Sequence, residues 1–487
     1  MLFNSIQYAL FLPVVFLLYW FVFNKKLRLQ NLLLLVSSYF FYACWDYRFL
    51  FLLVFSTLLD YYTGLKLSDT SVKARRRFWF WLSIIINLGF LGVFKYYNFF
   101  VESFADMIGH FGLNIDPWTL SVILPVGISF YTFHGLSYVI DIYNNRIKAE
   151  RDFVVYSVFV SFFPLLVAGP IERATHLLPQ IKSGRKFDYT QAADGLRQIL
   201  WGLFKKVVIA DTCAEYANII FNNSEQYSGF TLVVGAVFFA FQIYGDFSGY
   251  SDIALGTARL FGIDLLRNFA FPYFSRDIAE FWRRWHISLS TWFRDYLYVP
   301  LGGSRGGMWM KVRNTFIIFI VSGFWHGANW TFIVWGALNA LYFLPLLLLN
   351  KNRNNLEIAG QNSVFPSLKE LFQMMLTFAL TVLAWIFFRA KDISHAFHYL
   401  KDLFAGLLKK ESIIQFLNFM ISRVDKSILI FLVFFIVVEW IGRRHHYAIA
   451  DFGLKRNPLY RWCFYFCLAM AIILFAGKEQ QFIYFQF

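Results

Sequence analysis

Apolar segments, each near the length of a membrane helix, alternate with short polar connections along the chain. A helix needs about 20 mostly apolar residues to cross a bilayer, and by that rule the pattern predicts roughly 11 to 13 spans. Several segments are short, so we expect some of them to be re-entrant, tilted or interfacial. The segments are Gln7–Phe23, a helical pair within Leu29–Leu65, Trp79–Phe99, Leu120–Tyr143, Val154–Ala168, Ala192–Ile209, Phe230–Tyr244, Thr315–Phe324, Trp330–Leu349, Leu371–Phe388, Leu429–Ile441 and Trp462–Phe475. The sequence therefore predicts an all-α polytopic membrane protein.

The charges between these segments predict their orientation. Basic connections at Asn24–Arg28 and Lys73–Arg77 flank the helical pair, whereas the connection that holds Glu102, Asp106 and Asp116 has no Lys or Arg. Because cytoplasmic loops are enriched in Lys and Arg, the basic connections are expected inside and the acidic one outside. The first apolar run has neither a basic start nor a small-residue cleavage site, so we expect a retained helix rather than a signal peptide.

Composition supports the same class. Of 487 residues, 58% are hydrophobic and only 15% are charged, and the net charge is +15. In a membrane protein this excess positive charge is expected beside anionic lipid, so it does not indicate a nucleic-acid partner. The four cysteines show no CxxC or Cys/His ligand spacing, so the sequence supports neither a disulfide framework nor a zinc site.

The stretch "SRDIAEFWRRWHISLSTWFRDYLYVPLGGSR", residues Ser275–Arg305, departs from the simple membrane pattern. It is crowded with charged and aromatic side chains. Each charge on a lipid-facing helix costs about 2.5–3.5 kcal/mol on insertion scales, so these residues cannot all face lipid. We expect the stretch to lie at an interface or inside the protein around a wet cavity. Glu280 and Arg284 are spaced for a helical ion pair.

Histidines are the main candidates for chemistry. His134 shares a helix face with Asp141, so an internal hydrogen-bonded pair is as reasonable there as a functional site. His286 and His326 are flanked by tryptophans in apolar surroundings. Taken alone, each would more often be a structural histidine, but a buried neutral imidazole is also suited to act as a general base. Asn329, close by, could orient a reacting group.

Other motifs exclude some chemistries. No GxSxG nucleophile elbow is present, so a covalent acyl-serine intermediate has no support in the sequence. "YGDFSGYSDIALG", Tyr244–Gly256, contains Asp246 but matches no metal loop, and a hydrogen-bonded break between membrane segments is the preferred interpretation. "PLGGSRGG", Pro300–Gly307, lacks the ending of a phosphate-binding loop, so a nucleoside triphosphatase is not indicated.

Two long strings carry a family resemblance. "DFSGYSDIALGTARLFGIDLLRNFAFPYFSRDIAEFWRRWHISLSTWFRDYLYVPLGGSR" and "FIVSGFWHGANWTFIVWGALNAL" resemble the signature core of the membrane-bound O-acyltransferase (MBOAT) family. "FYTFHGLSYVIDIY" and "FFPLLVAGPIER" extend this similarity, which covers residues 124–341 strongly. The similarity is greatest to the bacterial alginate O-acetyltransferase-like branch.

The resemblance implies one integral membrane domain over residues 1–487, with a ring of helices around a central tunnel. The family's catalytic histidine matches His326, and its second active-site position, His or Asn, matches His286. These residues are 40 positions apart, as the family pattern expects. We also expect a group of nearby residues to contact substrate or line the tunnel. These candidates are Trp325, Asn329, Asp246, Trp285, Arg283 and Asp295.

The resemblance also implies a reaction. An acyl group, expected to be acetyl from acetyl-CoA, would pass from a cytoplasmic thioester towards hydroxyls of an extracytoplasmic polysaccharide. An SGNH-hydrolase-like periplasmic or surface protein would complete delivery, and the chain would be a multi-pass protein of the bacterial cytoplasmic membrane. No bound cofactor and no metal are expected.

Three alternatives remain open. Within the family, a D-alanyl transferase to teichoic acid would take its donor from a carrier-protein thioester. From a different class, a transporter or flippase would line a substrate path with polar residues, although such folds usually show related halves and none is found here. A non-catalytic subunit of a polysaccharide export complex is the third.

Overall fold

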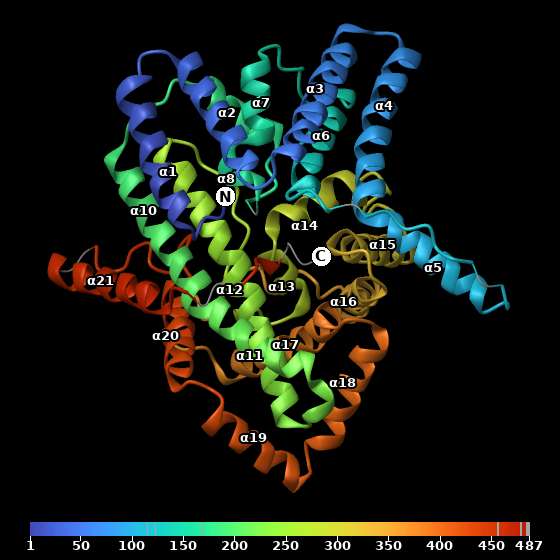
Figure 1. Ribbon diagram of the computed structural model, residues 1–487, viewed down its shortest axis with the longest axis vertical. Coiled ribbons are helices and arrows are strands. Elements are labelled where there is room, and N and C mark those ends of the chain that lie inside the picture. Colours follow the sequence, from blue (N-terminus) through green and yellow to red (C-terminus); the bar gives the residue numbers. More distant parts are fainter. Residues whose placement is uncertain (114, 122, 168, 455–456, 478–479, 484–487) are drawn as a thin grey trace. The chain divides into compact units, whose positions relative to one another are not determined.

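The computed structural model describes residues 1–113, 115–121, 123–167, 169–454, 457–477 and 480–483, which form helices joined by turns (Figure 1). Within those ranges there is no β-strand. Six helical stretches are long and apolar enough to cross a bilayer: Tyr47–Asp69, Lys73–Gly109, Phe230–Leu260, Trp330–Leu348, Leu368–Arg389 and Pro458–Phe475. This confirms the prediction of an all-α polytopic membrane protein. Other predicted spans correspond to shorter helices, as at Phe153–Ser161.

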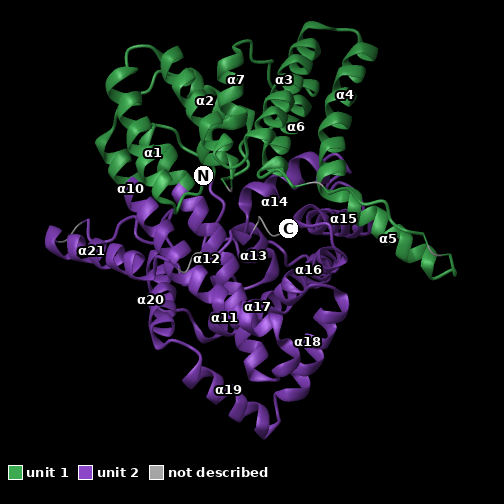
Figure 2. Cartoon of the chain, viewed as in Figure 1, with its two compact units in different colours: residues 1–195, 254–266 green, residues 196–253, 267–487 purple. Residues whose placement is uncertain are grey.

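The chain divides into two compact units (Figure 2). Unit 1 contains residues 1–195 and 254–266, and unit 2 contains residues 196–253 and 267–487. Helices α10 (Tyr189–Leu203) and α12 (Phe230–Leu260) contribute residues to both units. That residues 1–487 form a single membrane domain stays a prediction.

Unit 1 is built from the N-terminal helices and from α9 (Ala174–Lys182). Asp60 on α3 is buried, and its carboxylate accepts hydrogen bonds from Ser83 Oγ at 2.7 Å and from Asn87 Nδ2 at 2.8 Å, both on α4. Buried polar groups need such partners, so these bonds fix how α3 meets α4. The other helices of the unit are α1 (Ile6–Leu17), α2 (Leu27–Ala43), α3 (Tyr47–Asp69), α4 (Lys73–Leu91), α5 (Tyr97–Gly109), α6 (Ile128–Tyr143), α7 (Phe153–Ser161) and α8 (Phe163–Leu166).

Unit 2 contains His286 and His326, the two histidines that the sequence analysis favoured as catalytic residues. A π-helical segment, Phe204–Ala210, leads into α11 (Asp211–Asn222). Two short helices of 7 residues each, α13 (Ile278–Arg284) and α14 (Ile287–Phe293), follow α12. The remaining helices are α15 (Met308–His326), α16 (Trp330–Leu348), α17 (Leu368–Arg389), α18 (Ile393–Gly406), α19 (Lys410–Ser422), α20 (Lys426–Gly442) and α21 (Pro458–Phe475).

Helix α12 corrects one sequence interpretation. Tyr244–Gly256, expected to interrupt the membrane segment, lies inside one continuous 31-residue helix. Its glycines permit close packing rather than a break: a Cβ atom at Gly249 would lie 2.8 Å from the carbonyl oxygen of Gly202, closer than real Cβ contacts. Glycine in a membrane helix is therefore compatible with a continuous helix when a neighbouring backbone packs against it.

Helices α15 and α16 form a hairpin whose backbones approach closely at two glycines. A Cβ atom at Gly323 would collide with the carbonyl oxygen of Phe332, and one at Gly336 would collide with that of Phe319. Small residues at helix contacts permit this approach within membranes. At Gly323 the structure places the backbone of α16 where a side chain would otherwise lie.

We predict that Gly323→Ala destabilises the protein by about 1–3 kcal/mol, because the added methyl group meets a backbone atom that cannot rotate away. Thermal unfolding in detergent would measure the change. Gly89→Ala on α4 is the matched control, since no atom lies within 4 Å of its Cβ position. Equal stability of the two variants would contradict this account of the hairpin.

Candidate active site

His326 is the last residue of α15, at the turn of the hairpin. Gly327 is extended, with φ −165°, and Asn329 caps the N-terminus of α16 by accepting a hydrogen bond from Thr331 N. The amide of Asn329 also donates to the carbonyl oxygen of Lys391 at 2.9 Å, beyond the end of α17. These bonds fix the turn that carries His326, so Asn329 acts on the position of the backbone.

His286 separates α13 from α14 and has a left-handed backbone, with φ 43° and ψ 55°. A non-glycine residue in this region carries strain of about 1–3 kcal/mol and persists only where its surroundings hold it. Here Ile287 N donates to the carbonyl oxygen of Asn268 at 2.9 Å, and the Asn268 side chain bonds to Ser288 at 2.6 Å and to Ser251 at 3.0 Å. This network ties the turn to α12.

The two imidazoles lie close together inside an aromatic enclosure. Their ring centroids are 6.4 Å apart, and only 1% of His286 and 5% of His326 is exposed. Trp325 contacts both rings, at 4.8 Å from His326 and 6.0 Å from His286. Around them, Phe247 packs edge-on to His286, while Trp335 and Phe388 pack edge-on to His326. The structure thus brings together the two histidines that the sequence singled out.

Burial determines the charge of His286. Removal from water penalises the imidazolium form and lowers the pKa of His286 to about 3. The side chain is therefore neutral at physiological pH. A neutral imidazole can accept one hydrogen bond and donate another.

This shift predicts a pH dependence that one substitution removes. The folded pKa lies below the unfolded value of 6.5, so the stability contribution is complete above pH 6.5 and is lost as the pH falls. Between pH 7 and pH 5, wild type should lose about 2 kcal/mol more than His286→Asn. Asn tolerates the left-handed backbone. Thermal unfolding at both pH values measures the difference, and parallel losses in the two proteins would contradict the assignment.

Trp285, like Trp325, was predicted to contact substrate or line the tunnel, and it also lies at this site. Its indole contacts that of Trp385 at 5.1 Å, and Trp385 stacks on Trp335 at 5.6 Å. Trp335, Trp385 and Phe388 were not singled out from the sequence. They occupy apolar membrane segments, where aromatic residues are common and give no specific signal.

Arg283 and Asp295 have other contacts. The Arg283 guanidinium donates to the carbonyl oxygens of Asn352 and Asn355, both at 2.7 Å, and so holds the connection between α16 and α17. Asp295 pairs with Arg294 at 2.8 Å. That either residue contacts substrate or lines the tunnel stays a prediction.

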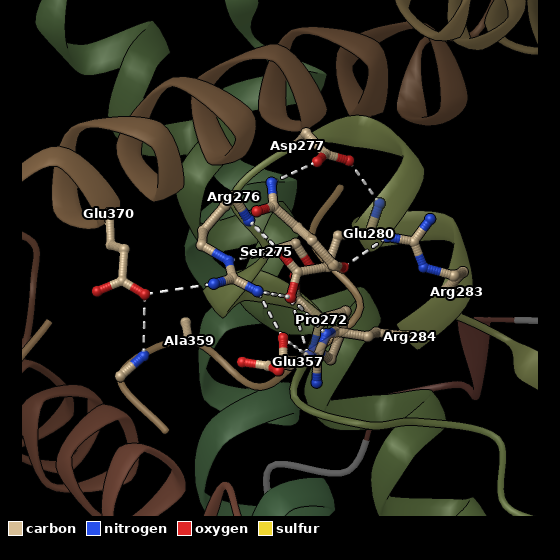
Figure 3. Close-up of polar contacts among 12 residues, drawn as sticks. Pro272, Ser275, Arg276, Asp277, Glu280, Arg283, Arg284, Glu357, Ala359 and Glu370 are labelled. Atoms are coloured by element: carbon tan, nitrogen blue, oxygen red, sulfur yellow. Dashed lines mark hydrogen bonds and ion pairs between the residues drawn. The ribbon is translucent and has the colours of Figure 1, made fainter. Parts of the chain in front are cut away.

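A cluster of charges centred on Glu280 lies beside Arg283 (Figure 3). The buried carboxylate of Glu280 binds Arg284 at 2.9 Å and Arg276 at 3.1 Å, which confirms the expected Glu280–Arg284 helical pair. Arg276 also reaches Glu370 at the start of α17, and both arginines donate to the carbonyl oxygen of Glu357. The part of the charged stretch from Arg276 to Arg284 is thus largely buried and its groups pair with one another, whereas Arg294 is exposed.

Asp246 belongs to a buried ion cluster that the sequence analysis missed. Lys206 Nζ lies 2.8 Å from Asp246 and 2.7 Å from Asp211, and all three side chains are buried. Lys206 also donates to the carbonyl oxygen of Gln480, and Asp246 accepts from Ile483 N at 2.7 Å, so the cluster fixes a C-terminal segment. The signal was present, because two adjacent lysines inside an apolar run are costly without buried partners.

His134 in unit 1 lies in a separate polar group. Its Nε2 accepts a hydrogen bond from Glu172 N at 3.0 Å, and the Glu172 carboxylate binds His176 Nδ1 at 2.8 Å. Asp141 instead pairs with Arg146 at 3.0 Å. The suggested His134–Asp141 pair is therefore wrong: the connection between α8 and α9 supplies the partner of His134, and the connection after α6 supplies that of Asp141.

Comparison with known proteins gives a consistent result. The family model described as "MBOAT, membrane-bound O-acyltransferase family" matches residues 144–363. A "Probable alginate O-acetylase" of Pseudomonas aeruginosa is 39% identical over 404 residues, which cover 82% of this chain and 74% of the relative. A "Peptidoglycan O-acetyltransferase" of Helicobacter pylori is 37% identical, covering 83% and 80%. A "Teichoic acid D-alanyltransferase" of Streptococcus thermophilus is 30% identical, covering 50% and 62%.

Proposed function

Because this chain belongs to the membrane-bound O-acyltransferase family, we propose that it moves an acetyl group from acetyl-CoA towards hydroxyls of an extracytoplasmic polysaccharide. The chain is a multi-pass membrane protein and an acyltransferase. The thioester would approach from the cytoplasm, and the membrane would be the bacterial cytoplasmic membrane. No cofactor would remain bound between turnovers.

The observation that carries this proposal is the pair of buried imidazoles 6.4 Å apart. His326 takes the proton of the acceptor hydroxyl while the oxygen attacks the acyl carbon. The carbon–sulfur bond then breaks, and the departing thiolate receives the proton from His326. His286, held neutral by burial, hydrogen-bonds the reacting groups and positions them. Each step balances without a metal or a covalent enzyme intermediate.

The enclosure around the imidazoles suits this chemistry. Trp325, Trp335 and Phe388 exclude bulk water from His326, which protects the thioester from hydrolysis. In this scheme Trp285 acts indirectly, through the aromatic layer that it forms with Trp385 and Trp335, and Asn329 acts through the hairpin turn. We also propose that Asp246, Arg283 and Asp295 line a substrate tunnel, which measurements of substrate binding would test.

The identity of the acyl group rests on the relatives. Two O-acetyltransferases match more than four fifths of this chain, whereas the D-alanyltransferase matches half of it. This difference favours acetyl over D-alanyl. The relatives named for alginate and for peptidoglycan both act on a glycan, which supports a polysaccharide acceptor. An SGNH-hydrolase-like partner outside the membrane would complete delivery.

Proteoliposomes with radiolabelled acetyl-CoA test the proposal. We expect loss of the thioester that depends on the protein, with the label passing to an added polysaccharide or partner protein. A parallel sample receives a D-alanyl carrier-protein thioester. Turnover of the carrier thioester alone would show the D-alanyl reaction instead. No turnover of either thioester with partner and acceptor present would overturn the enzymatic proposal and favour a transporter or a non-catalytic subunit.

A further inference from the structure

Unit 2 contains a cavity of about 190 Å³, two of whose lining residues, Tyr244 and Tyr273, contact Trp285. Four elements enclose it: α12, the turn Phe271–Phe274, α17 and α20. Its walls are almost wholly apolar, with many aromatic rings and two methionines. The lining residues are Phe241, Tyr244, Phe271, Tyr273, Phe274, Leu371, Met374, Met375, Phe378, Phe435, Ile436 and Glu439.

The wall of the cavity offers water few hydrogen-bonding partners. Its one carboxylate, Glu439, is buried and accepts hydrogen bonds from Tyr244 Oη at 2.5 Å and from Trp201 Nε1 at 3.2 Å, both within the protein. Cavities of this size with apolar walls stay dry and bind apolar molecules. Flexible methionine walls adapt to such a guest. The chemistry of the walls therefore selects a hydrocarbon ligand.

The mouth of the cavity lies on an exposed apolar surface. Leu371, Met375 and Ile436 line the cavity and are also 41%, 63% and 39% exposed. They lie on α17, which is long and apolar enough to cross a bilayer, and on α20, whose exposed face includes Val433 and other aliphatic residues. A surface of this kind meets the acyl chains of the bilayer. The acyl chains expected around the mouth are thus hydrocarbon, as is the ligand that the walls select.

We propose that this cavity binds one acyl chain of a bilayer phospholipid, which enters between α17 and α20. The inner wall gives the site a consequence for the enzyme, since the rings of Tyr244 and Tyr273 lie 6.1 Å and 6.0 Å from that of Trp285, the residue before His286. A bound acyl chain would pack against Tyr244 and Tyr273 and so help to hold Trp285 in place. The site is independent of the transferred acyl group and does not rest on the proposed function.

Photo-crosslinking in nanodiscs tests the proposal. The full-length protein is placed in phosphatidylethanolamine and phosphatidylglycerol with a phosphatidylcholine that carries a diazirine on one acyl chain. After irradiation, mass spectrometry locates the adducts. We expect adducts on the buried lining residues Met374 and Phe435, in addition to the exposed faces of the helices. Adducts confined to exposed residues would overturn the proposal.

A matched pair of variants shows whether the cavity itself is occupied. Met374→Trp fills the cavity and should reduce adducts on Phe435 and Phe378 several-fold. Leu376→Trp adds the same ring to an exposed position of α17 outside the cavity and should leave them unchanged. Met374→Ala, which enlarges the space, should retain or increase labelling and covers the case in which the tryptophan variant does not fold. Equal labelling in both tryptophan variants would contradict the proposal.

A further arm separates two sources of hydrocarbon. The tail of a long-chain acyl thioester has the same chemistry as a phospholipid chain. If palmitoyl-CoA abolishes labelling of Met374 and Phe435 while labelling of the exposed residues persists, the cavity belongs to a thioester substrate and the proposal is wrong. If dilution with unlabelled phospholipid reduces labelling and palmitoyl-CoA does not, the phospholipid assignment stands.

Discussion

His326→Ala is expected to reduce the rate of acyl transfer by about 10²–10⁴-fold, the usual contribution of a general base. The rings of Trp325, Trp335 and Phe388, which contact His326, have no group that could accept the hydroxyl proton in its place. The neighbouring His286 belongs to another turn. Loss of radiolabelled acetyl-CoA in proteoliposomes measures the effect, after gel filtration has shown that the variant is folded.

Two further variants separate catalysis from packing. His326→Gln keeps a polar side chain of similar size, so it should restore stability lost in His326→Ala but not activity. His398→Ala, at an exposed position on α18, should keep the wild-type rate. A folded His326→Gln protein with more than half of the wild-type activity would show that His326 is structural.

Lys206→Met is expected to lower the free energy of unfolding by about 3–5 kcal/mol, the cost of leaving buried charges without their partner. The lysine ammonium lies between Asp211 and Asp246, and neither carboxylate is exposed to water that could replace it. The bond from Lys206 to the carbonyl oxygen of Gln480 is lost as well, so the C-terminal segment should loosen. Thermal unfolding in detergent would show the loss.

A control and a rescue test the cause. Lys401→Met, at an exposed site on α18, makes the same chemical change and should leave stability nearly unaltered. Adding Asp211→Asn and Asp246→Asn to Lys206→Met removes the uncompensated charge and should recover part of the loss. If the triple variant is no more stable than Lys206→Met, the effect comes from packing of the lysine stem and not from charge.

The sequence predicted the class of the protein and singled out two histidines that lie close together, in both cases for physical reasons. Apolar runs of membrane length have few alternatives to helices in a bilayer, so the all-α class could be inferred directly. His286 and His326 stood out because an ionisable side chain in apolar surroundings is costly and needs a reason. The structure adds their separation and the rings of Phe247, Trp335 and Phe388 around them.

Long-range partners account for what the sequence could not predict. The sequence does not show that the Arg283 guanidinium donates to two backbone carbonyl oxygens about 70 positions away in the chain. Asp246 is similar, because Lys206 and Ile483 reach it from distant segments. Nor does local sequence show that Gly249 serves close packing within α12, since the backbone of Gly202 is what lies against it. In each case the contact joins residues that are distant in the chain, so local sequence spacing does not predict it.

The stacked indoles of Trp335 and Trp385 also give the protein an optical signal of its own. Their rings are 5.6 Å apart at an interplanar angle of 19°, and Trp335 packs edge-on to His326. Coupled indoles in a fixed, asymmetric arrangement give intense circular dichroism in the near ultraviolet. A ligand that enters beside His326 would change this coupling, so occupancy of the enclosure could be followed in unlabelled protein, before any chemistry takes place.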